Sequence, residues 1–292
     1  MTLSARIKRR FFATCLFAAL PLVIGADIQT QLDRADELHE SREHVTSFDL
    51  LAATLADVSS DAQRAEVYWR MAREQMDIGG EAKRNGASDA QLLTIYEQGE
   101  AFADRAITAD PYQALGYYWK SVHLGRWGQI RGALNALFKL EGMRSLLEQT
   151  VNLDPDHAPS YFVLGQLFTR VPGFPLSFGN VDYGVSFGRR ALEQRLEVAA
   201  AGTADGMDWD YYVALAAALH DRNWSATKRA REQARKQERY GRSSSTYERG
   251  RYYEAMVELS EQSDREEAVA LLELVVSELT ANAGGCPECR RD

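Results

Sequence analysis

The chain has 292 residues and a net charge of −8, which argues against nucleic acid or anionic lipid as its partner. Both of these are bound through clustered Lys and Arg, which an acidic chain offers poorly. The length suits one large domain or a continuous repeat array with a sizeable core.

The first residues have the order of a secretory signal peptide. Basic residues within 6–10 precede the apolar stretch 11–24, which is followed by the small residues Gly25 and Ala26. The apolar stretch is shorter than the roughly 20 residues that a membrane-spanning helix needs. We therefore predict a cleaved signal peptide over residues 1–26 and a periplasmic or secreted protein, with a retained membrane anchor as the alternative.

Residues 27–281 are predicted to form one helical repeat domain. Long Ala-, Leu-, Glu-, Arg- and Gln-rich stretches favour helices, and the chain contains only 7 prolines. No alternating strand pattern with Asn-Gly or Asp-Gly turns competes. Glycine and proline punctuation leaves segments of about 12 to 20 residues, the length expected for paired antiparallel helices.

The first predicted helical segment contains His39 and His44, close to the zinc-protease pattern HExxH. These histidines are five residues apart instead of four. On one continuous helix, at about 100° per residue, their side chains would point about 140° apart and could not share a metal ion. We therefore predict no metal site and no cofactor.

Catalytic motifs do not appear elsewhere. The sequence lacks a Gly-x-Ser-x-Gly elbow, a phosphate loop and a Gly-x-Gly-x-x-Gly fingerprint. We expect no enzymatic activity, and an enzyme of unfamiliar type is the least favoured alternative.

An internal repeat indicates the fold. After Asp154 and Pro155, residues Tyr161, Leu164, Gly165 and Phe168 have the spacing of the first helix of a tetratricopeptide unit. The small Gly165 allows that helix to approach the next one closely. The fold class predicted is all-α, an irregular tetratricopeptide-like solenoid of helical hairpins with C-terminal capping helices at about 245–259 and 264–280.

An earlier unit follows Asp110 and Pro111 and continues through Tyr117 and Leu124, but Lys120 stands where a Leu is expected. The two Asp-Pro marks are further apart than the roughly 34 residues of a regular unit. A longer second helix, or a helix packed outward, would absorb the excess within 127–140.

Residues at fixed places after the first signature aromatic of each tetratricopeptide unit line the concave surface of such arrays. Applied to this chain, the rule predicts a mixed aromatic and apolar binding groove, suited to an extended peptide or an apolar small molecule. Its predicted residues are Trp69, Arg73, Tyr118, Val122, Phe162, Gln166, Val213 and His220. Arg73 and His220 are candidates to receive a carboxylate, or are ordinary solvated polar residues.

A proline- and glycine-rich insertion is predicted to form a rigid rim at one end of that groove. It consists of Pro172, Gly173, Phe174, Pro175, Phe178, Gly179 and Asn180. Exposure of Phe174 or Phe178 would mark a contact surface, whereas burial of both would make the segment a packing plug.

The C-terminal part carries a basic cluster within 228–239, which we interpret as the solvated face of one helix. The tail, 282–292, contains Cys286 and Cys289. We expect these to form a small disulfide or to belong to a disordered tail. A redox motif or half of a zinc site is the alternative.

The stretch from about 101 to 191 resembles the TatT component of bacterial tripartite ATP-independent periplasmic (TRAP) transporters, through DPYQALGYYWKSVHLG and LLEQTVNLDPDHAPSYFVLGQLFTRVPGFPLSFGN. It is also similar to the related helical repeat fold of the regulator-of-microtubule-dynamics proteins. The TatT resemblance implies a self-associating periplasmic adaptor or conduit that docks onto a solute-binding protein and handles an apolar or acidic small molecule. The alternative is a generic exported tetratricopeptide scaffold for envelope assembly.

Overall fold

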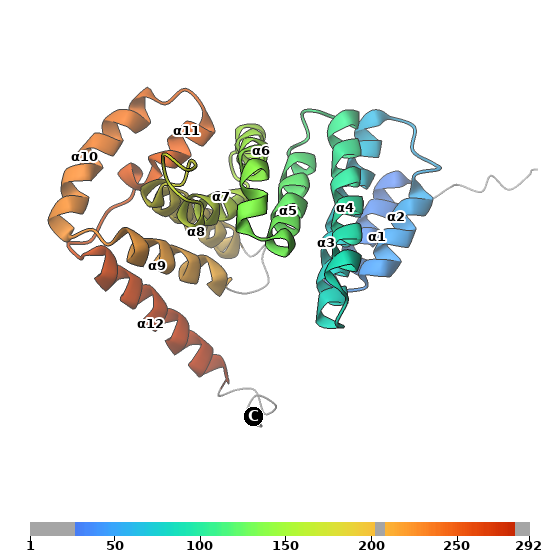
Figure 1. The fold of residues 1–292 in the computed structure, drawn as a ribbon. Coiled ribbons are helices and arrows are strands. Elements are labelled where there is room, and N and C mark those ends of the chain that lie inside the picture. Colours follow the sequence, from blue (N-terminus) through green and yellow to red (C-terminus); the bar gives the residue numbers. More distant parts are fainter. Residues whose placement is uncertain (1–26, 202–207, 284–292) are drawn as a thin grey trace, which may run out of the picture.

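A computed structural model describes residues 27–201 and 208–283, and these residues form helices without any strand (Figure 1). The all-α solenoid predicted from the repeat is confirmed. None of the helices in these ranges is long and apolar enough to cross a membrane. The predicted signal peptide, 1–26, and the two tail cysteines lie outside the described residues.

The helices are α1 (Ile28–Glu40), α2 (His44–Thr54), α3 (Asp61–Arg84), α4 (Asp89–Ala109), α5 (Ala114–Arg131), α6 (Ala133–Leu153), α7 (Ala158–Arg170), α8 (Val181–Ala200), α9 (Trp209–Arg222), α10 (Ala226–Arg242), α11 (Thr246–Arg251), η1 (Tyr253–Met256) and α12 (Asp264–Ala283).

Serine caps define where the long helices of the N-terminal half begin. The Ser60 hydroxyl accepts a hydrogen bond from the backbone N–H of Gln63, and the Gln63 side-chain oxygen accepts one from the backbone N–H of Ser60. Ser88 and Gln91 form the same reciprocal pair at the start of α4. Each of these reciprocal pairs, known as a capping box, satisfies two backbone N–H donors that have no partner within the first helical turn. The first residues of α3 and α4 are fixed in this way.

Helices pack as consecutive antiparallel pairs, with α3 against α4, α5 against α6, and α7 against α8. The two Asp-Pro turns are built alike. The hydroxyl of Tyr117 donates to the carbonyl of Pro111, and that of Tyr161 donates to the carbonyl of Pro155, both at 3.1 Å. This shared hydrogen bond confirms that the two segments are copies of one structural unit.

Gly165 sits where α7 crosses α8. A Cβ atom at this position would lie 3.2 Å from the carbonyl oxygen of Gly184 and 3.2 Å from the backbone nitrogen of Gly188. Such contacts are with backbone, which cannot rotate away, so the close approach of these helices requires glycine, as the sequence predicts.

The excess length between the two Asp-Pro turns is taken up within α5 and α6. Only Gly132, with φ 86°, separates the end of α5 from the start of α6, and α6 then continues for 21 residues to Leu153. A long second helix was one of the two expected solutions, and it is the one observed.

The histidines of the first segment do not share one helix, so the premise of the geometric argument against a shared ion is wrong. α1 ends at Glu40 and α2 begins at His44, with Arg42 in the left-handed region at φ 61°. The reversal brings the His39 and His44 rings to 5.2 Å between centroids, in a T-shaped contact.

The C-terminal basic cluster is not simply a solvated face, which corrects the interpretation given above. Arg229 and Lys236 of α10 are buried. Arg229 pairs with Asp264 and Glu267, while Lys236 donates to the carboxylate of Glu254 at 2.5 Å. The spacing of these arginines and lysines predicts a charged face on one helix. It does not show that carboxylates from α12 and η1 pack against that face.

Candidate functional site

The residues predicted to line a groove have different surroundings. Trp69 and Arg73 belong to α3 and are engaged with their neighbours: the Trp69 indole N–H donates to Glu66, and the Arg73 guanidinium pairs with Asp36 and Glu74. The Arg73 guanidinium carbon also lies 5.4 Å from the centre of the Trp69 ring. Arg73 thereby links α3 to α1 through Asp36, whereas the contacts of Trp69 are within α3.

Tyr118 and Phe162 pack against the central apolar core of α6, α7 and α8. Burial raises the pKa of Tyr118 to about 12, and its ring contacts that of His157 at 4.6 Å. Phe162 stacks on Tyr211 at 4.5 Å. Val122 and Gln166 are half-buried on the same helices.

Val213 and His220 lie on α9 and are exposed. His220 faces Asp221 at 3.5 Å, with two thirds of its side chain open to solvent. The structure therefore brings Phe162 close to α9 through Tyr211, but it leaves Trp69 and Arg73 at the opposite end of the array (Figure 1).

The predicted rim is a turn between α7 and α8. Pro172, Gly173, Phe174 and Pro175 are exposed, and among the side chains that the structure describes Phe174 is the most exposed large apolar one, at 93%. Phe178 instead packs against the ring of Phe168. The turn is therefore not a buried packing plug, and its role as a contact surface stays a prediction.

The end of the rim is fixed by backbone contacts. A Cβ at Gly179 would lie 1.7 Å from the carbonyl oxygen of Val171, so only glycine fits. Asn180 then caps α8, because its side-chain oxygen accepts hydrogen bonds from the backbone N–H groups of Asp182 and Tyr183.

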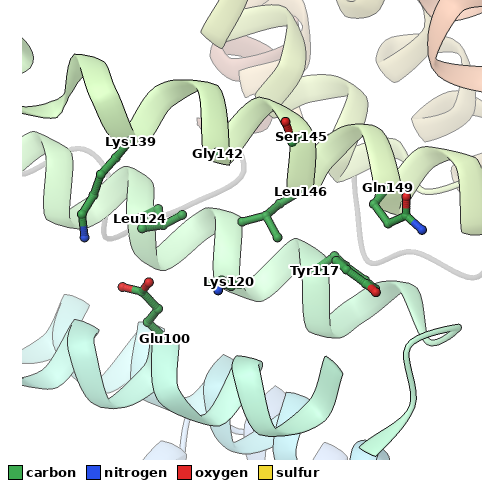
Figure 2. Close-up of a pocket in the computed structure, with 9 residues that line it drawn as sticks. All are labelled: Glu100, Tyr117, Lys120, Leu124, Lys139, Gly142, Ser145, Leu146 and Gln149. Atoms are coloured by element: carbon green, nitrogen blue, oxygen red, sulfur yellow. The ribbon is translucent and has the colours of Figure 1, made fainter. Parts of the chain in front are cut away.

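A groove of about 530 Å³ opens between α4, α5 and α6, and Figure 2 shows its lining residues. On α6 the residues are spaced by three or four, so they share one face of the helix. Two of them, Gly142 and Ser145, are too small to fill the space above α5, which leaves the groove open. The lining consists of Glu100, Tyr117, Lys120, Leu124, Lys139, Gly142, Ser145, Leu146 and Gln149.

The groove combines apolar and charged side chains, and Lys120 lies beside the two leucines in its middle (Figure 2). Leu124 and Leu146 lie in the middle of the groove in Figure 2, with Lys139 and Glu100 towards one end. Lys120 forms an ion pair with Asp104 at 2.6 Å, and the Lys139 ammonium lies 4.1 Å from the centre of the Trp127 ring. Both lysines are therefore positioned by neighbours while they remain on the groove wall.

The polar groups of the lining are engaged with their own neighbours. Its hydroxyl groups are occupied: Ser145 donates to the carbonyl of Glu141 at 3.0 Å, and Tyr117 donates to Pro111. The lining contains no histidine or cysteine. Leucine side chains flanked by lysines instead offer apolar contact and charge recognition.

The groove residues are next to predicted ones, since Tyr117 precedes Tyr118 and Lys120 precedes Val122 by two positions. One signal in the sequence could have found them: Lys120 replaces the Leu that the repeat pattern expects. A lysine at a position that normally packs between helices indicates that this side of α5 is not closed by α6.

Comparison with known proteins shows a similarity that includes this groove. A family model described as regulator of microtubule dynamics protein 1-3 matches residues 31–172. Regulator of microtubule dynamics protein 1 of Bos taurus is 24% identical over 139 residues, which are 48% of this chain and 41% of that protein. Regulator of microtubule dynamics protein 3 of Rattus norvegicus is 24% identical over 142 residues, 48% of this chain and 29% of that protein. The chain thus spans less than half the length of these curated relatives.

These findings correct the assignment drawn from the TatT resemblance. The family match supports the likeness to the regulators of microtubule dynamics, so the TatT and TRAP transporter assignment is wrong. The expected solute-binding partner and small-molecule transport role, and the alternative role in envelope assembly, are overturned with it. The periplasmic or secreted location is contradicted as well, because both relatives come from mammals, whose cells have no periplasm.

Proposed function

We propose that the chain is a non-catalytic binding module that acts on microtubules by holding a segment of tubulin in the groove between α4, α5 and α6. The groove itself carries the proposal. All of its lining residues fall within 31–172, the part of the chain that is similar to regulators of microtubule dynamics. A binding surface located there belongs to the segment that the relatives have in common with this chain.

The lining favours an extended segment with mixed chemistry. Leu124 and Leu146 would receive an apolar side chain, and Lys120 and Lys139 would attract acidic residues next to it. Apolar contacts would supply most of the affinity, whereas the lysines would set orientation and make binding weaker at high salt. The single carboxylate, Glu100, would disfavour a segment whose acidic residues approach α4.

A substitution that fills the groove tests this proposal. A side chain added at Gly142 meets open space, since no heavy atom outside its own helix turn lies within 4 Å of a Cβ built there. We therefore expect Gly142→Leu to keep the fold and to weaken binding of the full chain to microtubules at least tenfold in a co-sedimentation assay. The matched control is Gly241→Leu, where the Cβ also meets open space but lies on α10, outside the matched segment.

Reversing the charge of a groove lysine provides a second test of the same binding site. Lys139→Glu should weaken binding and reduce its dependence on salt, whereas Arg235→Glu, an exposed change on α10, should do neither. If Gly142→Leu binds microtubules like the unsubstituted chain while circular dichroism shows both folded, the groove is not the binding site. A chain that never co-sediments with microtubules would refute the proposed activity as a whole.

A further inference from the structure

A cluster of histidines and carboxylates lies where the first three helices meet. His39 is in the last turn of α1, and His44 is the first residue of α2. Glu74 and Asp77 are three residues apart on α3, so both project from the same face. Residues from three elements thus converge at one point, and Figure 1 shows these helices side by side at one end of the array.

The two imidazoles point at one carboxylate oxygen. The Nδ1 atoms of His39 and His44 lie 3.0 and 3.1 Å from the same Oε2 atom of Glu74. His39 Nδ1 is also 3.8 Å from a carboxylate oxygen of Asp77. One ligand atom from each of the four residues lies within 4.8 Å of every other.

We propose that His39, His44, Glu74 and Asp77 form a binding site for a single Zn²⁺ ion. In a tetrahedral zinc site, with metal–ligand bonds of about 2.0 to 2.1 Å, neighbouring ligand atoms are roughly 3.3 Å apart. The distances given above bracket that value. Two imidazole nitrogens and two carboxylate oxygens are ligand types that zinc takes, and the two carboxylates balance the charge of the ion.

Binding requires only a rearrangement of protons. Each neutral imidazole presents a lone pair at Nδ1 once its ring proton is on Nε2, so the ion takes the place of the hydrogen bonds to Glu74. No oxidant, reductant or further reactant takes part.

The neighbours of the cluster hold the ligands in place. The second oxygen of Glu74 accepts hydrogen bonds from the Arg73 guanidinium at 2.8 and 3.0 Å, and Arg73 is itself paired with Asp36 at 2.8 Å. A ligand carboxylate that is fixed through its other oxygen is a common arrangement around protein metal ions. This chain of contacts gives Arg73, predicted above as a groove residue, a positioning role toward the ion.

The cluster is enclosed on one side and open on the other. The Glu74 side chain is fully buried and that of His44 nearly so, whereas 39% of the Asp77 side chain and 27% of the His39 side chain are exposed. An ion can enter past Asp77, which then closes the coordination. Four protein ligands make this a structural site that joins the α1–α2 hairpin to α3, and it is separate from the groove that carries the proposed function.

The test is a zinc titration of the full chain by isothermal calorimetry. Because cysteines also bind zinc, it uses a background with Cys15→Ser, Cys286→Ser and Cys289→Ser. We expect one equivalent of Zn²⁺ to bind, with at least a hundredfold loss of affinity in His44→Gln and in Asp77→Asn. The control is His220→Gln, which changes an exposed histidine of α9 and should leave the affinity as it is.

Two further measurements keep the outcome clear. Co²⁺ in place of zinc should give the visible bands of a tetrahedral site without the sulfur-to-metal band that cysteine ligands produce. Zinc should also raise the Tm of the cysteine-free chain but not that of folded His44→Gln, because an ion stabilises only the state that binds it. Absence of saturable zinc binding in the cysteine-free chain, or equal affinity in His44→Gln, would overturn the proposed site.

Discussion

His123 is a residue whose environment controls its charge. It is fully buried where α5 meets α3 and α4, and its Nε2–H donates to the carbonyl of Ala72 at 2.9 Å. Burial lowers the pKa of His123 to about 4. A Cβ at Gly99 would overlap this ring, so glycine on α4 makes room for it. The histidine is therefore a neutral packing residue at physiological pH.

This burial predicts an acid sensitivity. The unfolded chain takes up the His123 proton near pH 6.5 and the folded chain only near pH 4, so the contribution to stability is complete above pH 6.5 and is lost as pH falls towards 4. The loss should approach about 1.4 kcal/mol per pH unit. His123→Gln, which keeps a donor for Ala72, should show a shallower decline between pH 7 and pH 5 in urea unfolding. If the free energy of unfolding declined equally in His123→Gln and in the unsubstituted chain, His123 would not be the cause of the acid sensitivity.

Single residues differ in how far the sequence foretells their role. Gly165 could be predicted, because a repeat signature assigns it to a helix crossing where only a hydrogen fits. The pairing of His39 with His44 could not, since one continuous helix is the simplest interpretation of that stretch and the reversal at Arg42 has no Gly or Pro to mark it. A non-glycine residue with positive φ leaves little trace in sequence.

At the scale of helices, two glycines inside helices should respond in opposite ways to the same substitution. Gly165→Ala places a methyl group against the backbone of α8, so we expect a loss of about 1 to 3 kcal/mol in the free energy of unfolding. Gly142→Ala meets open space on α6 and should stabilise the helix by up to about 1 kcal/mol. Chemical denaturation of both variants checks this. If Gly165→Ala proved as stable as Gly142→Ala, α7 and α8 would tolerate the added methyl group and the argument from close approach would be wrong.

Helix positions could be predicted more fully than helix surfaces. Asp-Pro turns and serine caps mark the boundaries of α3, α4, α5 and α7, because capping depends on residues adjacent in sequence. Which side of α5 stays open depends on the small residues of α6, whose rotation about its own axis is set by tertiary packing. The set of groove residues predicted from the sequence therefore includes Tyr118, which packs against the core, and omits Lys120, which lines the groove.

For the molecule as a whole, a buried network of charges joins the C-terminal helices. Glu254 of η1 pairs with Arg189 of α8, Arg222 of α9 and Lys236 of α10, and these pairings hold its pKa well below the usual range despite burial, which raises it. Asp264 and Glu267 of α12 extend the network. The partners are distant in sequence, so only the fold reveals them.

Removing the charge of Glu254 should be costly. Glu254→Gln removes the one carboxylate that Arg189, Arg222 and Lys236 share, although each keeps a second partner in Glu267, Asp264 or Asp182. The buried cations then outnumber the buried carboxylates further, and we expect a loss of about 3 kcal/mol in the free energy of unfolding. Glu238→Gln, which breaks an exposed pair with Arg242, should change it by less than about 1 kcal/mol. Thermal and urea unfolding of the two variants provide the comparison. A small effect at Glu254 would show that water or rearranged side chains replace the carboxylate.

Site-specific photo-crosslinking can show whether the groove between α4, α5 and α6 receives a segment of tubulin. A photoreactive side chain at Gln149, an exposed residue of the groove wall, would be activated in the presence of microtubules, with the same group at Arg235 on α10 as control. We expect a tubulin peptide, rich in acidic residues, to be crosslinked to position 149 and to be absent from position 235. Crosslinking to tubulin from position 235 alone, or from neither position, would contradict it.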